Sequence, residues 1–199
     1  MPQAAFEFQY PVAGDAKLAA EVSSRLRDCR FHPVLDHQRG LDHAVYVPMT
    51  LLRPHANIPI VQMSILKGRD EQDSTEKNIK LGRAVECFRD AGYAIIGSGG
   101  SYHDFVAIAK AFFENQHVTA GAEEFEDFLQ FAASIPDPAL RERTLFDWRK
   151  LPASYLAHPS DQSEHLMPFM VAAGSGGNNA GVKFARYEYK GAPMSFYMW

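Results

Sequence analysis

Histidines supply most of the residues in this chain that could do chemistry, and one of them follows a glycine-rich turn. Gly97-Ser98-Gly99-Gly100 comes after a short apolar segment, and Tyr102-His103 follows it. Glycines let a backbone approach a ligand closely, and an imidazole titrates near neutral pH, so it can act as a general base or acid. We therefore predict His103 as a catalytic residue, with Gly99, Gly100 and Tyr102 beside the substrate. A turn of this kind also serves as a tight exit from a strand.

A second group of histidines lies near the carboxyl end, where His158-Pro159 precedes Glu164-His165 at the start of an apolar helix. The spacing differs from the HExxH pattern, so one helix does not offer both imidazoles to zinc. A residue before proline is usually extended, so His158 is expected in a loop, where we predict contact with the substrate. His165 is predicted as a polar partner of the catalytic base, although a single histidine in this place is more often structural.

A third candidate is the pair Asp42-His43, which follows Gly40 in a predicted turn. A carboxylate beside an imidazole can orient a proton relay, so His43 is predicted as catalytic and Asp42 as substrate-binding. Taken alone, the pair is common in proteins. The remaining histidines stand in polar surroundings and are interpreted as surface residues: His32, His37, His55 and His117.

Amphipathic periodicity predicts the helices that must position these residues. Asp15 is the predicted N-cap of a helix that ends near Cys29. Asp73, with Glu76 three residues later, predicts a capping box, and Gly92 predicts the end of that second helix. Further helices are expected over residues 123–133, 137–148 and 163–173, the last stopped by Gly174.

Short apolar and β-branched segments predict the strands, over residues 31–35, 44–47, 58–65, 93–96, 182–189 and 194–199. The order of helix, strand and glycine turn before residue 100 is typical of an α/β fold, in which ligands gather beyond the carboxyl ends of the strands. We expect one domain over residues 1–199, an α/β fold with an open central sheet and helices on both faces.

Composition narrows the partners and the compartment. The net charge of −4 and the pI near 6.0 give no reason to expect binding to nucleic acid. The densest group of basic residues is interpreted as a solvated helix face; it comprises Arg141, Arg143, Arg149 and Lys150. Two cysteines are too few for a disulfide framework or a thiolate metal site. Because no apolar run suits a membrane span or a signal peptide, we expect a soluble, cytoplasmic protein with no membrane partner.

Several motifs follow one another in an order that extends over nearly the whole chain. They are Tyr10-Pro11-Val12-Ala13-Gly14-Asp15, Arg39-Gly40-Leu41-Asp42-His43, Ile58-Pro59-Ile60-Val61-Gln62-Met63-Ser64, Ile95-Ile96-Gly97-Ser98-Gly99, Ala157-His158-Pro159, Glu164-His165-Leu166-Met167-Pro168 and Met194-Ser195-Phe196-Tyr197. In this order they resemble the class III extradiol ring-cleavage dioxygenases of the 4,5-DOPA dioxygenase type. The resemblance covers the carboxyl-terminal three-quarters of such a protein and implies the same fold, truncated at its amino end.

The resemblance also implies roles for individual residues. In that family an Fe(II) ion, or a zinc ion in the isolated protein, binds a catecholic substrate and O2. The acid–base histidine of the family corresponds to His103, its late metal ligand to His165, and a histidine near substrate or oxygen to His43. Two earlier ligands come from a His-Gly-Ser-Pro turn and a Ser-Ala-His-Trp strand end, and this sequence contains neither. Ala44 replaces a family glycine, and Tyr102-His103-Asp104 replaces Thr-His-Asn, so a changed ligand is expected.

One retained ligand position cannot hold a divalent ion, because O2 activation at non-haem iron needs about three protein ligands. We therefore predict a metal-free enzyme without a cofactor. His103 would act as general base or acid, helped by His43 and His165, on a phenolic or carbonyl-containing aromatic metabolite. Isomerisation, cyclisation, elimination and ring opening need no O2 and are the expected reactions. The missing strands would leave an open sheet edge, so a homodimer or other homo-oligomer is expected.

Two alternatives stay open at this point. In one, the chain is a genuine Fe(II) or zinc dioxygenase whose missing ligands come from residues outside this sequence. In the other, it is a non-catalytic remnant that binds a ligand or a partner protein. Iron content with O2 consumption on a catechol would identify the first, and a function that survives loss of all three histidines would identify the second. The resemblance places an enzyme of this kind in aromatic, and particularly secondary, metabolism.

Overall fold

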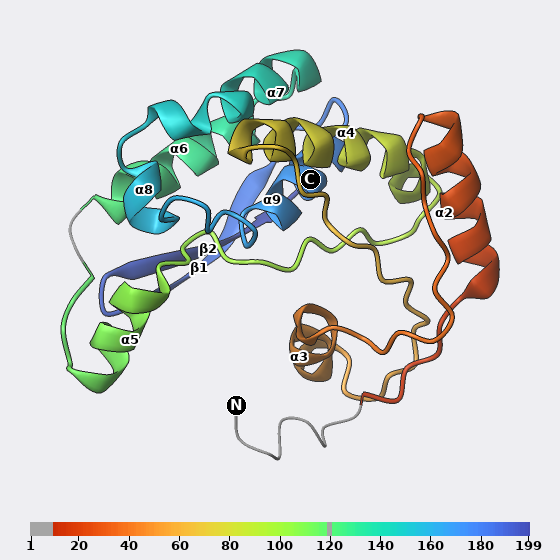
Figure 1. The fold of residues 1–199 in the computed structure, drawn as a ribbon, viewed down its shortest axis with the longest axis horizontal. Helices are drawn as coiled ribbons and strands as arrows, with labels where there is room; N and C mark the ends of the chain where they lie inside the picture. The colour runs from red at the N-terminus through yellow and green to blue at the C-terminus, as the bar shows by residue number, and fades with distance from the viewer. Residues whose placement is uncertain (1–9, 119–120) are drawn as a thin grey trace. The chain divides into compact units, whose positions relative to one another are not determined.

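The computed structural model describes residues 10–118 and 121–199, which fall into two compact units (Figure 1). The first unit ends at Ser64, and the second runs from Ile65 to Trp199. The single domain expected over residues 1–199 stays a prediction. Within the described residues, no helix is both long enough and apolar enough to cross a membrane.

Among the described residues of the first unit, the regular structure consists of two capped helices. α2 (Ala16–Asp28) begins where predicted, because the Asp15 carboxylate accepts a hydrogen bond from the Leu18 amide at 2.9 Å. α3 (His43–Leu52) begins in the same way, with the Asp42 carboxylate accepting from the Ala44 amide at 3.1 Å. The strand predicted over residues 44–47 is therefore wrong: a capping aspartate starts a helix on β-branched residues that also suit a strand.

Three further segments predicted as strands form no ladder in the described part of the chain: residues 31–35, 58–65 and 93–96. A strand exists only beside a hydrogen-bonded neighbour, and none of the described residues supplies one to these segments. Some of their apolar side chains stay exposed, such as Val34 at 88%. The open central sheet expected from the sequence is thus not present among the described elements, which combine helices with one small sheet.

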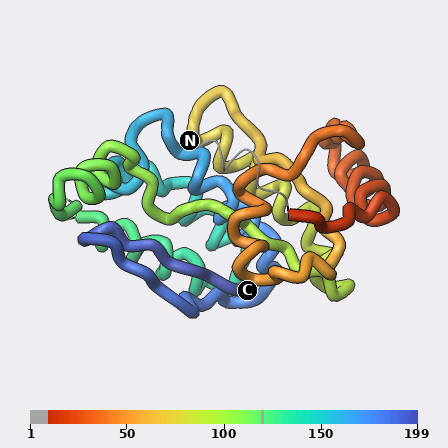
Figure 2. Tube along the Cα trace, turned by 90° about the horizontal axis from the view of Figure 1, so that it is seen from below, coloured from red at the N-terminus to blue at the C-terminus, as the bar shows by residue number. Residues whose placement is uncertain are grey.

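A hairpin forms that small sheet, in the second unit. β1 (Val182–Tyr189) and β2 (Ala192–Met198) pair antiparallel and run side by side (Figure 2). Two residues connect them, Lys190 and Gly191, and both have positive φ (47° and 87°), as a type I′ turn requires. The two strands predicted at the carboxyl end are confirmed, with β2 beginning two residues earlier than expected.

The close approach of two helices fixes the core of the second unit. α4 (Glu71–Asp90) packs along α9 (Met167–Ser175). A Cβ atom at Gly82 would lie 2.1 Å from a carbonyl oxygen of α9, and one at Gly174 would lie 2.3 Å from a carbonyl oxygen of α4. The backbones come this close only because both residues are glycine. α9 therefore continues through Gly174, where a stop was predicted, and it begins four residues later than expected.

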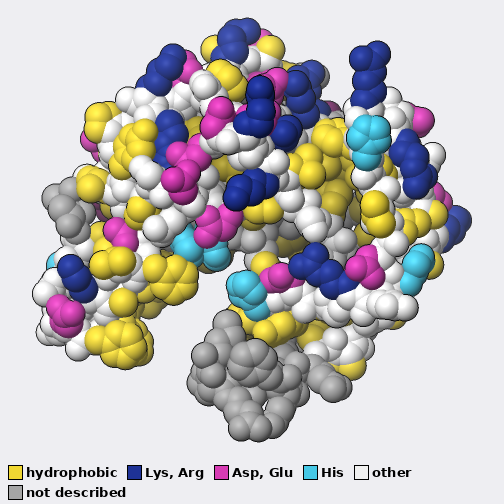
Figure 3. Space-filling view, in the orientation of Figure 1, with side chains coloured by type: hydrophobic (Ala, Val, Ile, Leu, Met, Phe, Trp, Pro, Cys, Tyr) yellow, Lys and Arg dark blue, Asp and Glu magenta, His cyan; other side chains and the backbone are white. Residues whose placement is uncertain are grey.

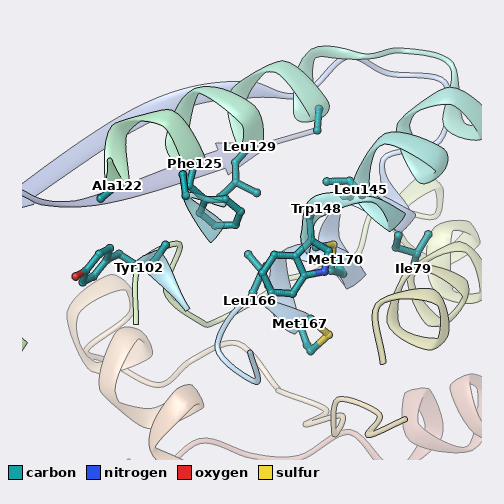
Figure 4. Packing of buried hydrophobic residues seen from close by; sticks show 14 of the residues in the cluster. Ile79, Tyr102, Ala122, Phe125, Leu129, Leu145, Trp148, Leu166, Met167 and Met170 are labelled. Atoms are coloured by element: carbon teal, nitrogen blue, oxygen red, sulfur yellow. The ribbon is translucent and has the colours of Figure 1, made fainter. Parts of the chain in front are cut away.

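Shorter helices surround this pair. They are α5 (Phe105–Phe113), α6 (Ala122–Ser134), α7 (Pro138–Phe146), the 3₁₀ helix η1 (Trp148–Lys150) and α8 (Ser154–Ala157). α6 and α7 confirm the helices predicted over residues 123–133 and 137–148. The core between the elements contains fully buried Phe125, Leu129, Trp148, Leu166 and Met170 (Figure 4).

The start of α4 differs from the predicted capping box. Asp70 is the N-cap, and its carboxylate accepts from the Asp73 amide at 2.7 Å. The Asp73 carboxylate accepts instead from the Arg69 amide and the Lys77 ammonium, which lower the pKa of Asp73 to about 2. Gly92 follows the helix with φ 94°, which confirms its predicted role at the end of α4.

The basic group interpreted as a solvated helix face is only half exposed. Arg141 is 2% exposed, and Arg149 has 15% of its side chain exposed, whereas Arg143 and Lys150 lie at the surface. The Arg141 guanidinium donates to the carbonyl oxygens of Ile135, Ala173, Gly177 and Asn179. The interpretation is therefore wrong for Arg141 and Arg149, because carbonyls at helix ends and in loops draw guanidinium donors inward.

Replacing Arg141 by leucine should lower the free energy of unfolding by about 3 kcal/mol or more, because three buried carbonyl oxygens and a partly buried one lose a donor. Urea unfolding followed by circular dichroism measures the change. Arg143→Leu, on an exposed side chain of the same helix, is the matched control and should change stability by less than about 0.5 kcal/mol. Equal midpoints for the two variants would contradict the role of Arg141.

Candidate active site

Two histidines that are distant in the sequence meet in the second unit. His103 lies just before α5 and His165 just before α9, and their imidazole rings stack with centroids 3.6 Å apart and planes 10° from parallel. The Phe105 ring stands nearly perpendicular to that of His103, with centroids 4.8 Å apart. The structure thus brings together two of the three residues predicted as catalytic, while the roles assigned to them stay predictions.

Backbone hydrogen bonds hold the segments that carry the two histidines. The His103 amide donates to the Ala157 carbonyl at 2.7 Å, and the Gly100 amide donates to the His165 carbonyl at 3.0 Å. A Cβ atom at Gly99 would lie 2.2 Å from the same His165 oxygen, so the turn comes this close only without a side chain. In this structure Gly99 and Gly100 contact the His165 backbone, and their contact with a substrate stays a prediction.

The environment of His103 favours its neutral form. The residue is 8% exposed, and neither of its buried ring nitrogens has a hydrogen-bond partner among the described residues. Burial lowers its pKa, and the neighbouring His165 lowers it further, against the opposing charges of Glu164 and Asp104. The imidazole is therefore neutral at physiological pH and keeps a lone pair that can accept a proton.

Tyr102, predicted beside the substrate, is 3% exposed and belongs to the core cluster. Burial, and then the negative charge of Asp104, raises the pKa of Tyr102 to about 12, so its phenol stays protonated. Asp104 itself caps α5, accepting from the amides of Val106 and Ala107 at 2.9 and 3.0 Å. This cap fixes where α5 begins, directly after His103.

His158 lies inside the core, with 0% exposure. Its Nε2 atom is 3.0 Å from the Ser101 carbonyl oxygen, and since a carbonyl only accepts, this nitrogen carries the proton. The rings of Phe125 and Trp148 surround it. Burial, with a smaller contribution from Arg149, lowers the pKa of His158 to about 3. The contact of His158 in this structure is with Ser101, two residues before His103, and its predicted contact with a substrate stays a prediction.

Asp42 and His43 form the expected pair in the first unit. The His43 Nδ1 atom lies 2.7 Å from the Asp42 carboxylate, so the carboxylate orients the imidazole. The backbone of Asp42 is held in turn, because its amide donates to the Gln62 side-chain oxygen at 2.6 Å. The catalytic role of His43 and the substrate contact of Asp42 stay predictions.

Glu164 adds a carboxylate to the two stacked imidazoles. One donor atom each from His103, Glu164 and His165 lies within 4.8 Å of the others. Two imidazoles and a carboxylate suit non-haem Fe(II), and the buried nitrogens of His103 are available as donors, so the composition fits a divalent ion. An imidazole lone pair lies in the ring plane, so two parallel rings share one ion only after one of them turns. Sequence reasoning missed Glu164, although its place beside His165 was a signal.

Comparison with known proteins agrees with the motifs. Residues 2–198 match the family described as the catalytic LigB subunit of aromatic ring-opening dioxygenase. The chain is 34% identical to the dioxygenase tasH of Hapsidospora irregularis, over 100% of this chain and 61% of that protein. It is 31% identical to the 4,5-DOPA dioxygenase extradiol of Beta vulgaris, over 98% of this chain and 69% of that protein. The chain thus spans about three-fifths to two-thirds of these relatives.

Acid should destabilise the chain through His158. Its imidazole has a pKa of about 3 in the folded state against an ordinary pKa of 6.5, so between these values only the unfolded state binds the proton. Stability therefore falls as the pH falls, by on the order of 1 kcal/mol per pH unit. Urea unfolding at a series of pH values should show this slope in the wild type and a reduced slope in His158→Gln. His117→Gln, at an exposed histidine, should keep the wild-type slope. Identical slopes for all three proteins would contradict a buried neutral His158.

Proposed function

Because the chain belongs to the family of the catalytic LigB subunit of aromatic ring-opening dioxygenase, we propose that it acts on a phenolic or carbonyl-containing aromatic metabolite with His103 as general base or acid. The observation that carries the proposal is the state of His103. The ring is buried, its nitrogens have no hydrogen-bond partner among the described residues, and its pKa is held below the ordinary value. Such an imidazole is ready to accept a proton.

The proposed step is a proton transfer, and it needs no oxidant. A ring nitrogen of His103 takes the proton from a phenol, or from a carbon next to a carbonyl group. The imidazolium then returns the proton to another carbon or to an oxygen of the same molecule. The net reaction of the two proton transfers is an isomerisation. The same kind of transfer assists cyclisation, elimination or the opening of a lactone by water. The face of the His165 ring lies against His103 and orients it, while the negative charges of Glu164 and Asp104 favour the transient positive charge. Asp42 and His43 are proposed as further polar partners of the substrate.

A second candidate is ring cleavage by a metal-dependent dioxygenase. The donor set of His103, Glu164 and His165 favours it, and relatives named as dioxygenases match this chain. These three residues would hold Fe(II), which supplies the redox chemistry with O2 that ring cleavage requires. In that case the His103 lone pair is occupied, so the base for the substrate hydroxyl would be another group, within this chain or outside it.

Two probes test the leading proposal: L-DOPA as a catechol and dihydrocoumarin as a phenolic lactone. We call the probe that the protein turns over the accepted probe. His103→Ala should lower kcat on it by about a hundredfold or more, because the general base is lost. Protein dialysed against a chelator should keep the wild-type rate. His117→Ala, at an exposed histidine, is the matched control and should keep it too. Turnover that is indifferent to His103→Ala would overturn the proposal.

Elemental analysis separates the two candidates. Iron or zinc in stoichiometric amount, lost in Glu164→Gln, together with O2 consumption on L-DOPA that chelation abolishes, would establish the metal-dependent reaction in place of the metal-free one. A third possibility, a remnant that only binds a ligand or partner, predicts that L-DOPA binding survives replacement of His43, His103 and His165 together. Loss of binding in that triple variant contradicts the remnant.

Self-association also remains a proposal, as a homodimer or other homo-oligomer. In the described residues β1 and β2 pair only with each other, so each strand keeps one edge without a ladder partner. Apolar side chains gather over α5, where Phe112 is 65% and Phe113 82% exposed (Figure 3). Sedimentation equilibrium should give at least twice the 22.2 kDa mass of one chain, and Phe113→Ser should weaken the association. A mass of one chain at all concentrations would contradict it.

A further inference from the structure

We propose that Arg149 is a positioning residue for the stacked pair of His103 and His165, acting through the turn that follows α8. The inference rests on the proposed function, because it concerns the geometry of the same pair. Arg149 itself touches neither imidazole. Its guanidinium holds the backbone of residues 154–159, and hydrogen bonds from that backbone reach the segments that carry both histidines.

Arg149 is itself firmly placed. Its guanidinium forms a two-pronged ion pair with Glu71 at the start of α4: Nε donates to one carboxylate oxygen at 2.6 Å, and Nη2 donates to the other. The guanidinium also lies over the rings of Trp148 and Tyr155, 4.0 and 4.6 Å from their centroids. Both charged side chains are mostly buried, at 15% and 21% exposure, so solvent screens the pair only in part.

The remaining donors of Arg149 reach the backbone of the turn. Nη1 donates to the carbonyl oxygens of Ser154 and His158, at 3.2 and 2.5 Å, and Nη2 donates to that of Pro159 at 3.2 Å. These carbonyls lie in α8 and just beyond it, and Arg149 adds a donor to those of Ser154 and Pro159, which also accept from the amides of His158 and Gln162. One guanidinium therefore fixes the end of α8 and the His158-Pro159 turn together.

From this turn, two hydrogen bonds lead to the His103 segment. Ala157, inside the held turn, accepts from the His103 amide at 2.7 Å. The His158 ring donates to the Ser101 carbonyl at 3.0 Å, which fixes the backbone two residues earlier. The same chain segment continues from Pro159 to His165, whose carbonyl accepts from the Gly100 amide at 3.0 Å. Both stacked histidines therefore stand on backbone that is tied to the Arg149 contacts.

The contacts explain why the position needs an arginine. Five donors in a rigid planar fork serve a carboxylate and three carbonyls at once, whereas a lysine ammonium is a single point with three donors. Lysine at residue 149 would keep the charge beside Glu71 but not the spread of donors. If the positive charge alone held the segment, Arg149→Lys would keep the stacked pair of His103 and His165. If the planar set of guanidinium donors holds it, Arg149→Lys would lose the stack.

The test measures the geometry of the pair directly. In ¹H–¹⁵N spectra of the imidazoles, the carbon-bound protons of His103 and His165 should carry ring-current shifts from their stack. Diethyl pyrocarbonate modification, located by peptide mass spectrometry, reports how often His103 opens to solvent. In Arg149→Gln we expect loss of the ring-current shifts and a rate of His103 modification about tenfold higher or more, because local opening becomes easier. Arg149→Lys should resemble Arg149→Gln, and Glu71→Gln should show a smaller change in the same direction.

Arg143→Gln is the matched control, since Arg143 is exposed and close in sequence, and it should leave shifts and modification rates as in the wild type. Circular dichroism and thermal unfolding verify that each variant is folded. Should Arg149→Gln fail to fold, Glu71→Gln and Arg149→Lys carry the test. Folded variants of Arg149 and Glu71 with wild-type shifts and wild-type modification of His103 would overturn the proposal.

Turnover of the accepted probe gives a further readout. Arg149→Gln should lower kcat by about a hundredfold with a smaller effect on KM, because it displaces the base more than the substrate. The spectra and modification rates do not depend on catalysis. If His103→Ala leaves turnover unchanged while Arg149→Gln still unstacks the rings, the proposed function fails and the positioning role of Arg149 stands.

Discussion

The contact between the backbones of α4 and α9 is the constraint on which the rest of the second unit depends. Gly82 and Gly174 permit it, because any side chain at either place would meet a carbonyl oxygen of the other helix. The same two helices carry elements of the site, because α9 begins just after His165 and Glu71 in the first turn of α4 meets Arg149. A pair of packed helices, and not the end of a sheet, therefore positions the candidate site.

Around that pair, side-chain hydrogen bonds to backbone carbonyls stabilise irregular segments, as the hydrogen bonds of a strand ladder do in a sheet. Arg141, Arg149 and His158 are buried in whole or in part, and each donates to carbonyl oxygens of loops or helix ends. A buried carbonyl without a donor is costly, so each of these side chains stabilises an irregular segment that has no ladder of its own. Irregular backbone can in this way hold two imidazoles in contact.

The parts of this fold that the sequence predicts are those set by near neighbours. Asp15 as a cap, Gly92 as a helix end and the two carboxyl-terminal strands each depend on a few adjacent residues. The choice of His103 and His165 as candidate residues follows from motifs that keep their order along the chain. The burial of Arg149 and the core position of His158 depend on distant partners. Neighbouring residues alone predicted a solvated helix face for Arg149 and a loop in contact with substrate for His158. Residues 93–96 show the same limit, because an apolar segment becomes a strand only beside another strand.

The hydrogen bonds that join the Gly100–His103 segment to residues 157 and 165 close long stretches of chain, and this has a consequence for the order of folding. Contacts between such distant residues bring a loop-closure cost before they return any stabilisation. α4, α6 and the hairpin need only local contacts to begin. The two imidazoles meet only once the intervening helices have docked, so a chain arrested partway through folding has its secondary structure but not the contact between these two rings.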